Sequence, residues 1–185
     1  MALRLFVAVQ LPDPVRGRLA AEALRLAGDG RVVPAPNLHV TVQFLGSVAD
    51  DDVAALETAL AAAVAAVPAF TLHVTGVAPG PRRRPRMLWG LIGRDDRFDE
   101  LAGRVAEAAA PFAPDARLPR TARPHITLVR HRDAPPPDEA ALTADIPVEA
   151  VELVSSRLGP AGAAYETLTR LPLEPPAPVD QLKPV

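Results

Sequence analysis

Apolar and polar residues alternate strictly over a short stretch near the start of the chain. Between Asn37 and Gly46, every second residue from Val40 to Phe44 is apolar, and the residues between them are polar. Strict alternation predicts a half-buried β-strand whose apolar face packs into a core. His39 and Thr41 then share the opposite face, whereas on a helix they would point to nearly opposite sides. This stretch therefore presents an imidazole beside a hydroxyl on a rigid strand.

A near-copy of this stretch occurs later in the chain. Residues 125–130 read H-I-T-L-V-R, against H-V-T-V-Q-F at residues 39–44, so the order His, aliphatic, Thr, aliphatic recurs. The repetition indicates an internal duplication, in which each half contributes one His-x-Thr strand to a shared cleft. The sequence H-V-T at 73–75 matches only in part, because Gly76 follows it, and we interpret it as an exposed strand face. His131 lies between two arginines and is expected to be solvated.

The rest of the pattern predicts strands that alternate with helices. Further strands are expected at Leu3–Leu11, Phe70–Val77, Met87–Ile92, Val148–Leu158 and Tyr165–Leu173. Helices are expected after Asp13-Pro14, after Asp50–Asp52 and around Phe98–Ala108, where acidic caps, an N-terminal proline or a helical apolar period occur. No helix separates the last two strands, which favours an α+β fold with mostly antiparallel sheets over a doubly wound fold.

The composition limits the class of protein. The chain has 185 residues, 49% of them hydrophobic, which is enough for one domain or for two small lobes that share a cleft. The formal net charge of -2 predicts no general attraction to nucleic acids or membranes, so any site for a polyanion must be local. The absence of cysteine excludes disulfides and thiolate catalysis. The short apolar N-terminus is typical of a strand, and we expect a soluble, cytoplasmic protein.

Two imidazoles and two hydroxyls define the chemistry of the expected cleft. A neutral His takes a proton from water, while a protonated His donates one to a leaving oxygen. Thr hydroxyls hydrogen-bond the non-bridging oxygens of a phosphate held between them. His39 and His125 together therefore predict metal-free hydrolysis or transfer at a phosphodiester, without a cofactor. No carboxylate cluster with ligand spacing accompanies them, and G-x-S-x-G and the phosphate-binding glycine motifs are absent.

These motifs resemble the two-histidine phosphoesterase superfamily, and above all its RNA 2′,3′-cyclic phosphodiesterases, also described as 2′-5′ RNA ligases. The resemblance extends from Arg4 to Leu173 and includes the paired HxTx motifs, R-L-F-V-A-V-Q-L-P, R-M-L-W-G and S-S-R-L-G…Y-E-T-L. It implies one bilobed domain over residues 1–173, with two pseudo-symmetric lobes of mostly antiparallel sheet, helices on the outer faces and an active-site cleft between them. Residues 174–185 are expected to form a Pro-rich tail.

The resemblance also implies a substrate and a role for each site residue. The substrate is RNA with a 2′,3′-cyclic phosphate end, or a cyclic nucleotide, and the enzyme is a monomer that needs no metal and no membrane. His39 is the general acid that protonates the 3′-oxygen, and His125 is the general base that activates water. The symmetric sequence by itself leaves this order open. Thr41 and Thr127 hold the phosphate. Arg130 matches a substrate-binding position, but ideal alternation places it opposite His125, so its role requires a strand end or a bulge.

Two further groups of residues have alternative interpretations. One loop is either an RNA contact or a solvated basic loop, and its arginines are Arg82, Arg83, Arg84 and Arg86. Phe6, Phe44 and Trp89 are either base-stacking surfaces or core residues, and the alternation places Phe44 in the core.

The function also has alternatives. One is an ATP-independent 2′-5′ RNA ligase that joins 2′,3′-cyclic and 5′-hydroxyl ends. Another is a non-catalytic RNA- or nucleotide-binding module. The presence of two His and two Thr in matched motifs argues against the binding module, because binding alone needs no matched proton donors and acceptors.

Overall fold

The computed structural model of the protein describes residues 1–113, 116, 123–133, 140–159 and 162–175. Four sequence predictions lie wholly or partly outside these residues. They are the loop that precedes the second HxTx strand, the proline connector at 135–137, the turn of the final hairpin at 160–161 and the tail beyond residue 175.

Nine strands and three α-helices form the described part of the chain. The strands are β1 (Ala2–Gln10), β2 (Arg31–Val32), β3 (His39–Ala49), β4 (Phe70–Gly80), β5 (Met87–Ile92), β6 (His125–Arg130), β7 (Ala144–Val148), β8 (Ala150–Gly159) and β9 (Gly162–Pro172). The helices are α1 (Asp13–Leu26), α2 (Val53–Val64) and α3 (Asp96–Ala109), and the short 3-10 turns are η1 (Ala35–Asn37) and η2 (Asp50–Asp52).

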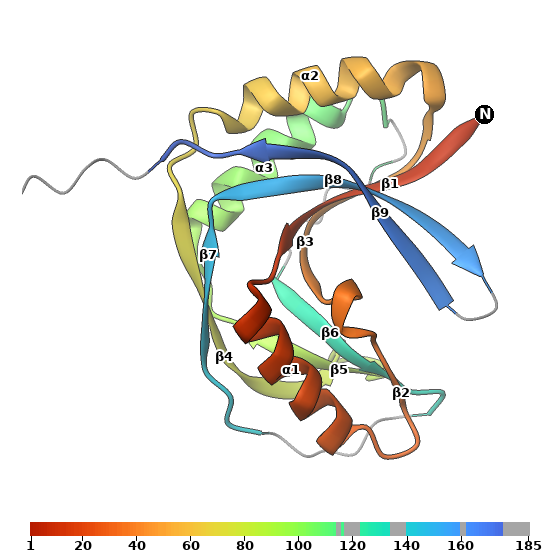
Figure 1. Cartoon of the computed structure of the whole chain (residues 1–185), viewed down its shortest axis with the longest axis vertical. Helices are drawn as coiled ribbons and strands as arrows, with labels where there is room; N and C mark the ends of the chain where they lie inside the picture. The colour runs from red at the N-terminus through yellow and green to blue at the C-terminus, as the bar shows by residue number, and fades with distance from the viewer. Residues whose placement is uncertain (114–115, 117–122, 134–139, 160–161, 176–185) are drawn as a thin grey trace, which may run out of the picture.

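The strands form one antiparallel sheet, which curls into a half-barrel (Figure 1). Their order is β7-β4-β5-β6-β3-β1-β8-β9, and β2 pairs with β6. The sheet has two four-stranded halves, which meet where Val40 of β3 pairs with Ile126 of β6. The predicted α+β fold with two related halves of antiparallel sheet is therefore confirmed, and the two HxTx strands lie at its centre.

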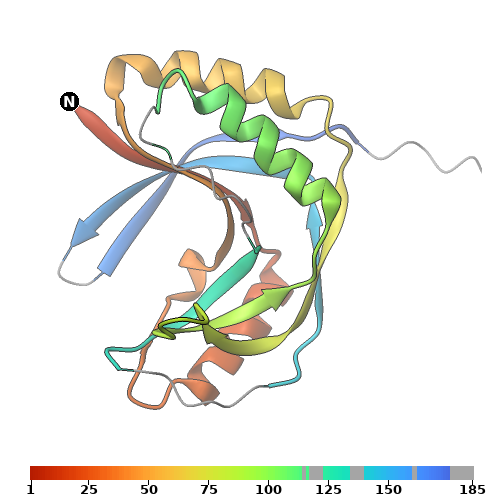
Figure 2. The ribbon, with the colours of Figure 1, turned by 180° about the vertical axis from the view of Figure 1, so that it is seen from behind.

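Two of the three α-helices, α1 and α3, join the two halves by packing on the half opposite the strand that they follow. Helix α1 follows β1 of one half but packs on β6 and β7 of the other. Leu19 of α1 lies close to Gly90 of β5, beside Ile126. Helix α3 follows β5 but packs on β3, next to α2 (Figures 1 and 2). Among the described residues, no helix is long and apolar enough to cross a membrane.

Helix α3 forms where the sequence predicts it. The Asp95 side chain caps the helix by accepting a hydrogen bond from the backbone N–H of Arg97 at 2.9 Å. Phe98, Leu101 and Val105 recur at helical spacing and are all fully buried against the sheet. The apolar stripe therefore predicts this helix from the sequence, and the structure adds the Asp95 cap.

Strand β7 is absent from the sequence predictions. Ala144, Ile146 and Val148 are buried, and they alternate with exposed Asp145 and Pro147. A proline cannot donate to a sheet ladder and is tolerated mainly on edge strands. This strand does lie at the edge of the sheet, paired only with β4. The alternation is present in the sequence, and Pro147 lies where an edge strand tolerates it.

Candidate functional site

The two HxTx motifs lie on neighbouring antiparallel strands at the junction of the halves. Val40 pairs with Ile126. One step to either side of this pair, antiparallel register places His39 across from Thr127 and Thr41 across from His125. All four side chains are half-buried, whereas Val40 and Ile126 are fully buried on the opposite face. The structure thus brings the four sequence-predicted residues together on one face.

Both imidazoles are held in the same way. His39 Nδ1 lies 2.7 Å from the Asn37 carbonyl oxygen, and His125 Nδ1 lies 2.9 Å from the Arg123 carbonyl oxygen. A carbonyl oxygen only accepts hydrogen bonds, so Nδ1 carries a proton in each ring. In the neutral rings, Nε2 is therefore the proton-accepting atom. His39 Nε2 lies 3.1 Å from the Thr41 hydroxyl, which donates to it in that state.

Burial and nearby charge lower the pKa of both histidines. Burial lowers the pKa of His39 below its ordinary value of 6.5, the bond to the Asn37 carbonyl opposes this, and the charges of Arg130 and His125 lower it further. Burial also lowers the pKa of His125, the Arg123 carbonyl opposes it, and Arg130 lowers it again. The two imidazoles therefore share one electrostatic environment.

A bulge in each HxTx strand changes which side chains face the cleft. In β3 the pairing with β1 skips Val42, because Val7 pairs with Gln43 and Ala8 with Thr41. Val42 and Gln43 are consequently both buried, and Phe44 turns to the cleft face with 58% of its surface exposed. The predicted core position of Phe44 is wrong for this reason.

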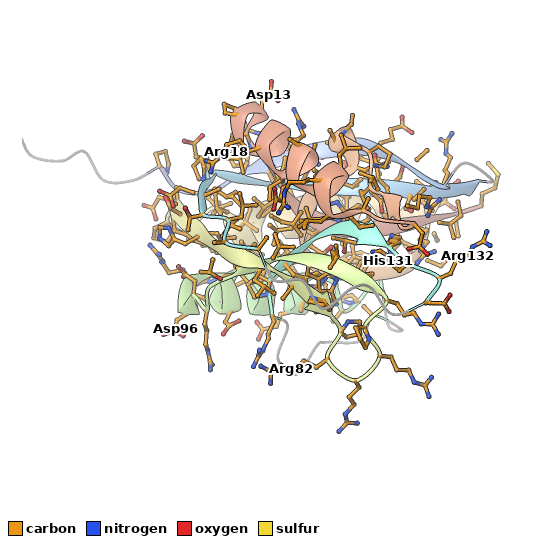
Figure 3. All side chains as sticks on the ribbon, turned by 90° about the horizontal axis from the view of Figure 1, so that it is seen from below. Asp13, Arg18, Arg82, Asp96, His131 and Arg132 are labelled. Atoms are coloured by element: carbon orange, nitrogen blue, oxygen red, sulfur yellow. The ribbon has the colours of Figure 1, made fainter. Side chains whose placement is uncertain are left out.

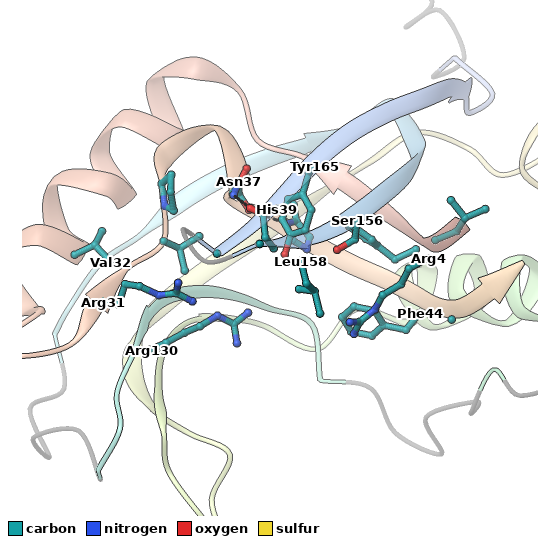
Figure 4. Close-up of a pocket in the computed structure, with 18 residues that line it drawn as sticks. Arg4, Arg31, Val32, Asn37, His39, Phe44, Arg130, Ser156, Leu158 and Tyr165 are labelled. Carbon is teal, nitrogen blue, oxygen red and sulfur yellow. Dashed lines mark hydrogen bonds between the residues drawn. The ribbon is translucent and has the colours of Figure 1, made fainter. Parts of the chain in front are cut away.

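The equivalent bulge in β6 settles the position of Arg130. The pairing with β5 skips Leu128, so Leu128 and Val129 are both buried, and Arg130 is exposed. Arg130 and His39 line the same groove (Figure 4). The bulge that this residue requires is therefore present. Because the two motifs correspond position by position, Phe44 and Arg130 occupy equivalent places in the two halves.

Different aromatic residues surround the two histidines. The ring of Phe6 is centred 4.9 Å from that of His39, and Tyr165 meets His39 edge-on at 5.4 Å. Phe6 belongs to a small cluster on the cleft side of the sheet, apart from the main core. Trp89 of β5 stacks on His125, with ring centres 3.9 Å apart. Phe6 and Trp89 therefore pack directly on the histidines.

A groove of about 670 Å³ opens beside His39 (Figure 4). Its lining includes residues of β1, β2, η1, β3, β6, β8 and β9, among them Arg4, Arg31, Asn37, Phe44, Arg130 and Tyr165. The sequence patterns assigned no role to Arg4, Arg31, Asn37 or Tyr165. Asn37 stands two residues before His39, and its side chain donates to the Ala163 carbonyl oxygen at 2.9 Å, linking the motif to β9. Arg4 and Tyr165 lie in two of the motifs that carry the resemblance, whereas no motif includes Arg31.

The other two histidines lie outside this arrangement. His73 of β4 is exposed and pairs with Asp145 of β7, Nδ1 to Oδ1 2.8 Å, which confirms the predicted exposed strand face. His131 is not solvated as predicted, because its side chain is only 3% exposed. It packs against Gly30, where a Cβ would fall 2.5 Å from the ring, and its backbone N–H donates to the Arg86 carbonyl.

The basic loop between β4 and β5 projects from the molecule, as the position of Arg82 shows in Figure 3. All of its arginines are exposed, and within the described part of the chain none forms an ion pair with a carboxylate. They are Arg82, Arg83, Arg84 and Arg86. Across the same described residues, no three His, Asp or Glu side chains gather closely enough to hold a metal ion.

The stack of Trp89 on His125 predicts a fluorescence titration. Trp89 is the only tryptophan in the chain, and a protonated imidazole in contact with an indole quenches its emission. Emission should rise with pH as His125 loses its proton, with a midpoint below 6.5 because the pKa of His125 is lowered. The titration should vanish in His125→Asn and persist in His39→Asn. A pH-dependent change in emission that persists in His125→Asn would show that another group controls the emission of Trp89.

The comparisons place this chain and its fold in a known family. The model of the 2′-5′ RNA ligase superfamily matches residues 11–160, and the chain belongs to this superfamily. A curated relative from Thermus thermophilus, named RNA 2′,3′-cyclic phosphodiesterase, is 33% identical over 183 residues, covering 92% of this chain and 90% of the relative. A relative of the same name from Thermotoga maritima is 26% identical, covering 90% of this chain and 93% of the relative.

Solved structures agree with this assignment. The crystal structure of TT0787 of Thermus thermophilus superposes with a TM-score of 0.84 at 26% identity, covering 94% of this chain and 99% of the other. The structure of E. coli LigT complexed with phosphate gives a TM-score of 0.76 at 28% identity, covering 94% and 98%. LigT complexed with 3′-AMP gives 0.78 at 28% identity, covering 94% and 99%.

Proposed function

We propose that this protein hydrolyses the 2′,3′-cyclic phosphate of RNA ends or nucleotides to a 2′-phosphomonoester, without a metal ion. One observation carries the proposal. Two imidazoles face one strand junction, and each has its Nδ1 proton bound to a carbonyl oxygen, so that both Nε2 atoms serve for proton transfer. The names of the relatives support the substrate, since four of them are RNA 2′,3′-cyclic phosphodiesterases.

In the proposed reaction, one proton enters at one histidine and another leaves from its partner. Neutral His125 accepts a proton at Nε2 from a water molecule, whose oxygen attacks the phosphorus. The bond from phosphorus to the 3′-oxygen breaks, and protonated His39 donates its Nε2 proton to that oxygen. The phosphate remains on the 2′-oxygen. Both histidines have then exchanged protonation states, and solvent restores them.

In this proposal, the two threonine hydroxyls and Arg130 bind the phosphate. Thr41 and Thr127 face the junction from opposite strands, and each donates a hydrogen bond to a non-bridging oxygen. Arg130 reaches the groove through the β6 bulge and supplies the positive charge that a phosphate monoanion requires. Trp89 packs on His125 and fixes the plane of its ring.

The asymmetry of the cleft supports His39 as the acid. The groove with Phe44 and Tyr165 lies on the His39 side, whereas Trp89 covers the His125 ring. A nucleoside therefore fits beside His39, and its 3′-oxygen points to that histidine. Attack in line with the breaking bond then brings water from the opposite side, where His125 lies.

The basic loop is a further candidate contact. We assign Arg82, Arg83, Arg84 and Arg86 to the RNA backbone, because they are exposed, lack carboxylate partners among the described residues and lie in the loop next to Trp89. Contacts of this kind give an affinity that falls steeply with salt.

Incubation with 2′,3′-cyclic AMP in EDTA tests the proposed function. We expect turnover in EDTA, with 2′-AMP as the product, identified by phosphorus NMR or chromatography against both monophosphates. Turnover that requires a divalent metal would overturn the metal-free mechanism. A 3′-AMP product would show that the bond to the 2′-oxygen breaks, and would contradict the proposed departure of the 3′-oxygen.

The same assay separates the alternative functions. In the ligase reaction a 5′-hydroxyl takes the place of water at His125, so an added 5′-hydroxyl oligonucleotide would be joined through a 2′-5′ bond. The family model that matches the chain bears this activity in its description. A binding module would bind the cyclic nucleotide and leave it unchanged.

A further inference from the structure

The groove beside His39 extends along the sheet from this histidine to Arg4 of β1. Phe6 links its two parts, because its ring lies 4.9 Å from His39 and 5.9 Å from Phe44. Arg4 precedes Phe6 by two residues on β1 and lines the same groove, about 7 Å further along the strand. Figure 4 shows Arg4 beside Phe44. The groove therefore continues past Phe44 to the positively charged side chain of Arg4.

Exposed apolar surface is concentrated in this groove. Among the described residues, four large hydrophobic side chains are exposed, and one of them is the terminal Met1. Leu24 lies on α1, while Phe44 and Leu158, exposed by 58% and 70%, both line the groove. Apolar side chains that remain exposed in a concave site are typical of a binding surface. The flat faces of nucleobases suit such a surface.

The arginines of the groove carry uncompensated charge. Elsewhere on the described surface, several arginines form ion pairs with carboxylates, namely Arg16, Arg25, Arg94, Arg97, Arg104 and Arg157. Within the same described residues, Arg4, Arg31 and Arg130 form none. Arg31 and Arg130 pair across β2 and β6, whereas Arg4 stands apart on β1. One cyclic phosphate engages Arg130, which leaves Arg4 free for a second anion.

We propose that the groove contains a subsite for the nucleotide that precedes the cyclic phosphate in single-stranded RNA. The terminal nucleoside lies between His39 and Phe44. The preceding base rests on Leu158, and the phosphate that joins the two nucleotides pairs with Arg4. The inference rests on the proposed function. It identifies an RNA end, and not a free cyclic nucleotide, as the preferred substrate of this site.

The ratio of two specificity constants tests this subsite. We compare kcat/KM for the dinucleotide ApA with a 2′,3′-cyclic phosphate and for 2′,3′-cyclic AMP. The wild-type ratio should be about tenfold or more, since a stacked base and a phosphate contact are added. In Arg4→Gln and in Leu158→Ala, the ratio should fall several-fold toward one. Arg157→Gln is the matched control, because Arg157 neighbours Leu158 and pairs with Glu166, and it should keep the wild-type ratio.

Raising the salt concentration gives a second measurement. The dinucleotide preference should shrink with salt in the wild type, and less so in Arg4→Gln, because the contact to the joining phosphate is electrostatic. A wild-type ratio near one, or a ratio that Arg4→Gln and Leu158→Ala leave unchanged, overturns the subsite while leaving the proposed function intact. Failure to hydrolyse either substrate overturns the proposed function itself.

Discussion

Replacing either His39 or His125 with alanine is expected to lower kcat on 2′,3′-cyclic AMP by about 10²- to 10⁴-fold. Each histidine transfers a proton at its Nε2 atom, and no neighbour replaces it. Both rings sit at the sheet centre with Nδ1 bound to a carbonyl oxygen, so truncation removes the proton-transfer group without removing a strand. Steady-state hydrolysis rates in EDTA give the measurement. Thermal unfolding of each variant checks that the fold is retained.

His73→Ala is the matched control for both variants. His73 also stands before a small aliphatic residue and a threonine on a strand, but it is exposed and pairs with Asp145 at the edge of the sheet. We expect its rate to stay within twofold of the wild type. A loss at His73 equal to that at His39 or His125 would show that proton transfer occurs on a different strand.

Replacing Arg130 with glutamine should have the second largest effect, in two separable parts. Loss of the charge-assisted contact to the phosphate should lower kcat/KM by about 10- to 100-fold, in keeping with about 1.5–3 kcal/mol for a hydrogen bond to a charged group. The second part is a shift of the pH optimum. The Arg130 charge lowers the pKa of both histidines, so its removal raises both pKa values and moves the optimum of kcat/KM upward.

Arg130→Lys separates the two effects. Lysine keeps the positive charge but lacks the planar fork of donors that grips a phosphate. We expect a reduced kcat/KM with a pH optimum close to that of the wild type. An optimum that stays in place in Arg130→Gln would contradict the electrostatic coupling between Arg130 and the histidines.

Much of the fold follows from local patterns in the sequence. The bounds of β5 and β6 coincide with the predicted strands at 87–92 and 125–130. The capped and amphipathic α3 also forms where expected. The contribution of both HxTx strands to one shared cleft was predictable because the motif recurs in the same order and on the same face of a strand; their direct pairing was not. The structure adds the register at Val40 and Ile126, which places each His across from the Thr of the other motif.

The wrong prediction for Phe44 arises where the sheet departs from ideal alternation. A bulge at Val42 turned Phe44 from the core into the groove, and the equivalent bulge at Leu128 turned Arg130 the same way. Bulges depend on how two strands pair, so one strand's pattern does not reveal them. Alignment of the two motifs does relate the two positions. Phe44 and Arg130 occupy the same position, and one bulge in the repeated unit implies the other.

The remaining site residues come from elements that are distant in the sequence. Arg4, Arg31 and Tyr165 reach the groove from β1, β2 and β9, which lie together only through the order of the strands. His131 shows the same limitation, since its burial depends on the missing side chain of Gly30. Long-range pairing of this kind leaves no periodic signal in the chain.

The pH dependence of kcat/KM tests the paired roles of the histidines most directly. His125 acts as a base when neutral, so activity falls as the pH drops through its pKa. His39 acts as an acid when protonated, so activity falls as the pH rises through its pKa. Both pKa values are lowered from 6.5, and the two groups titrate as a coupled pair. We predict a bell-shaped profile with its maximum below pH 6.5. A flat profile between about pH 5 and 8, or a rate that only rises with pH, would contradict the paired roles.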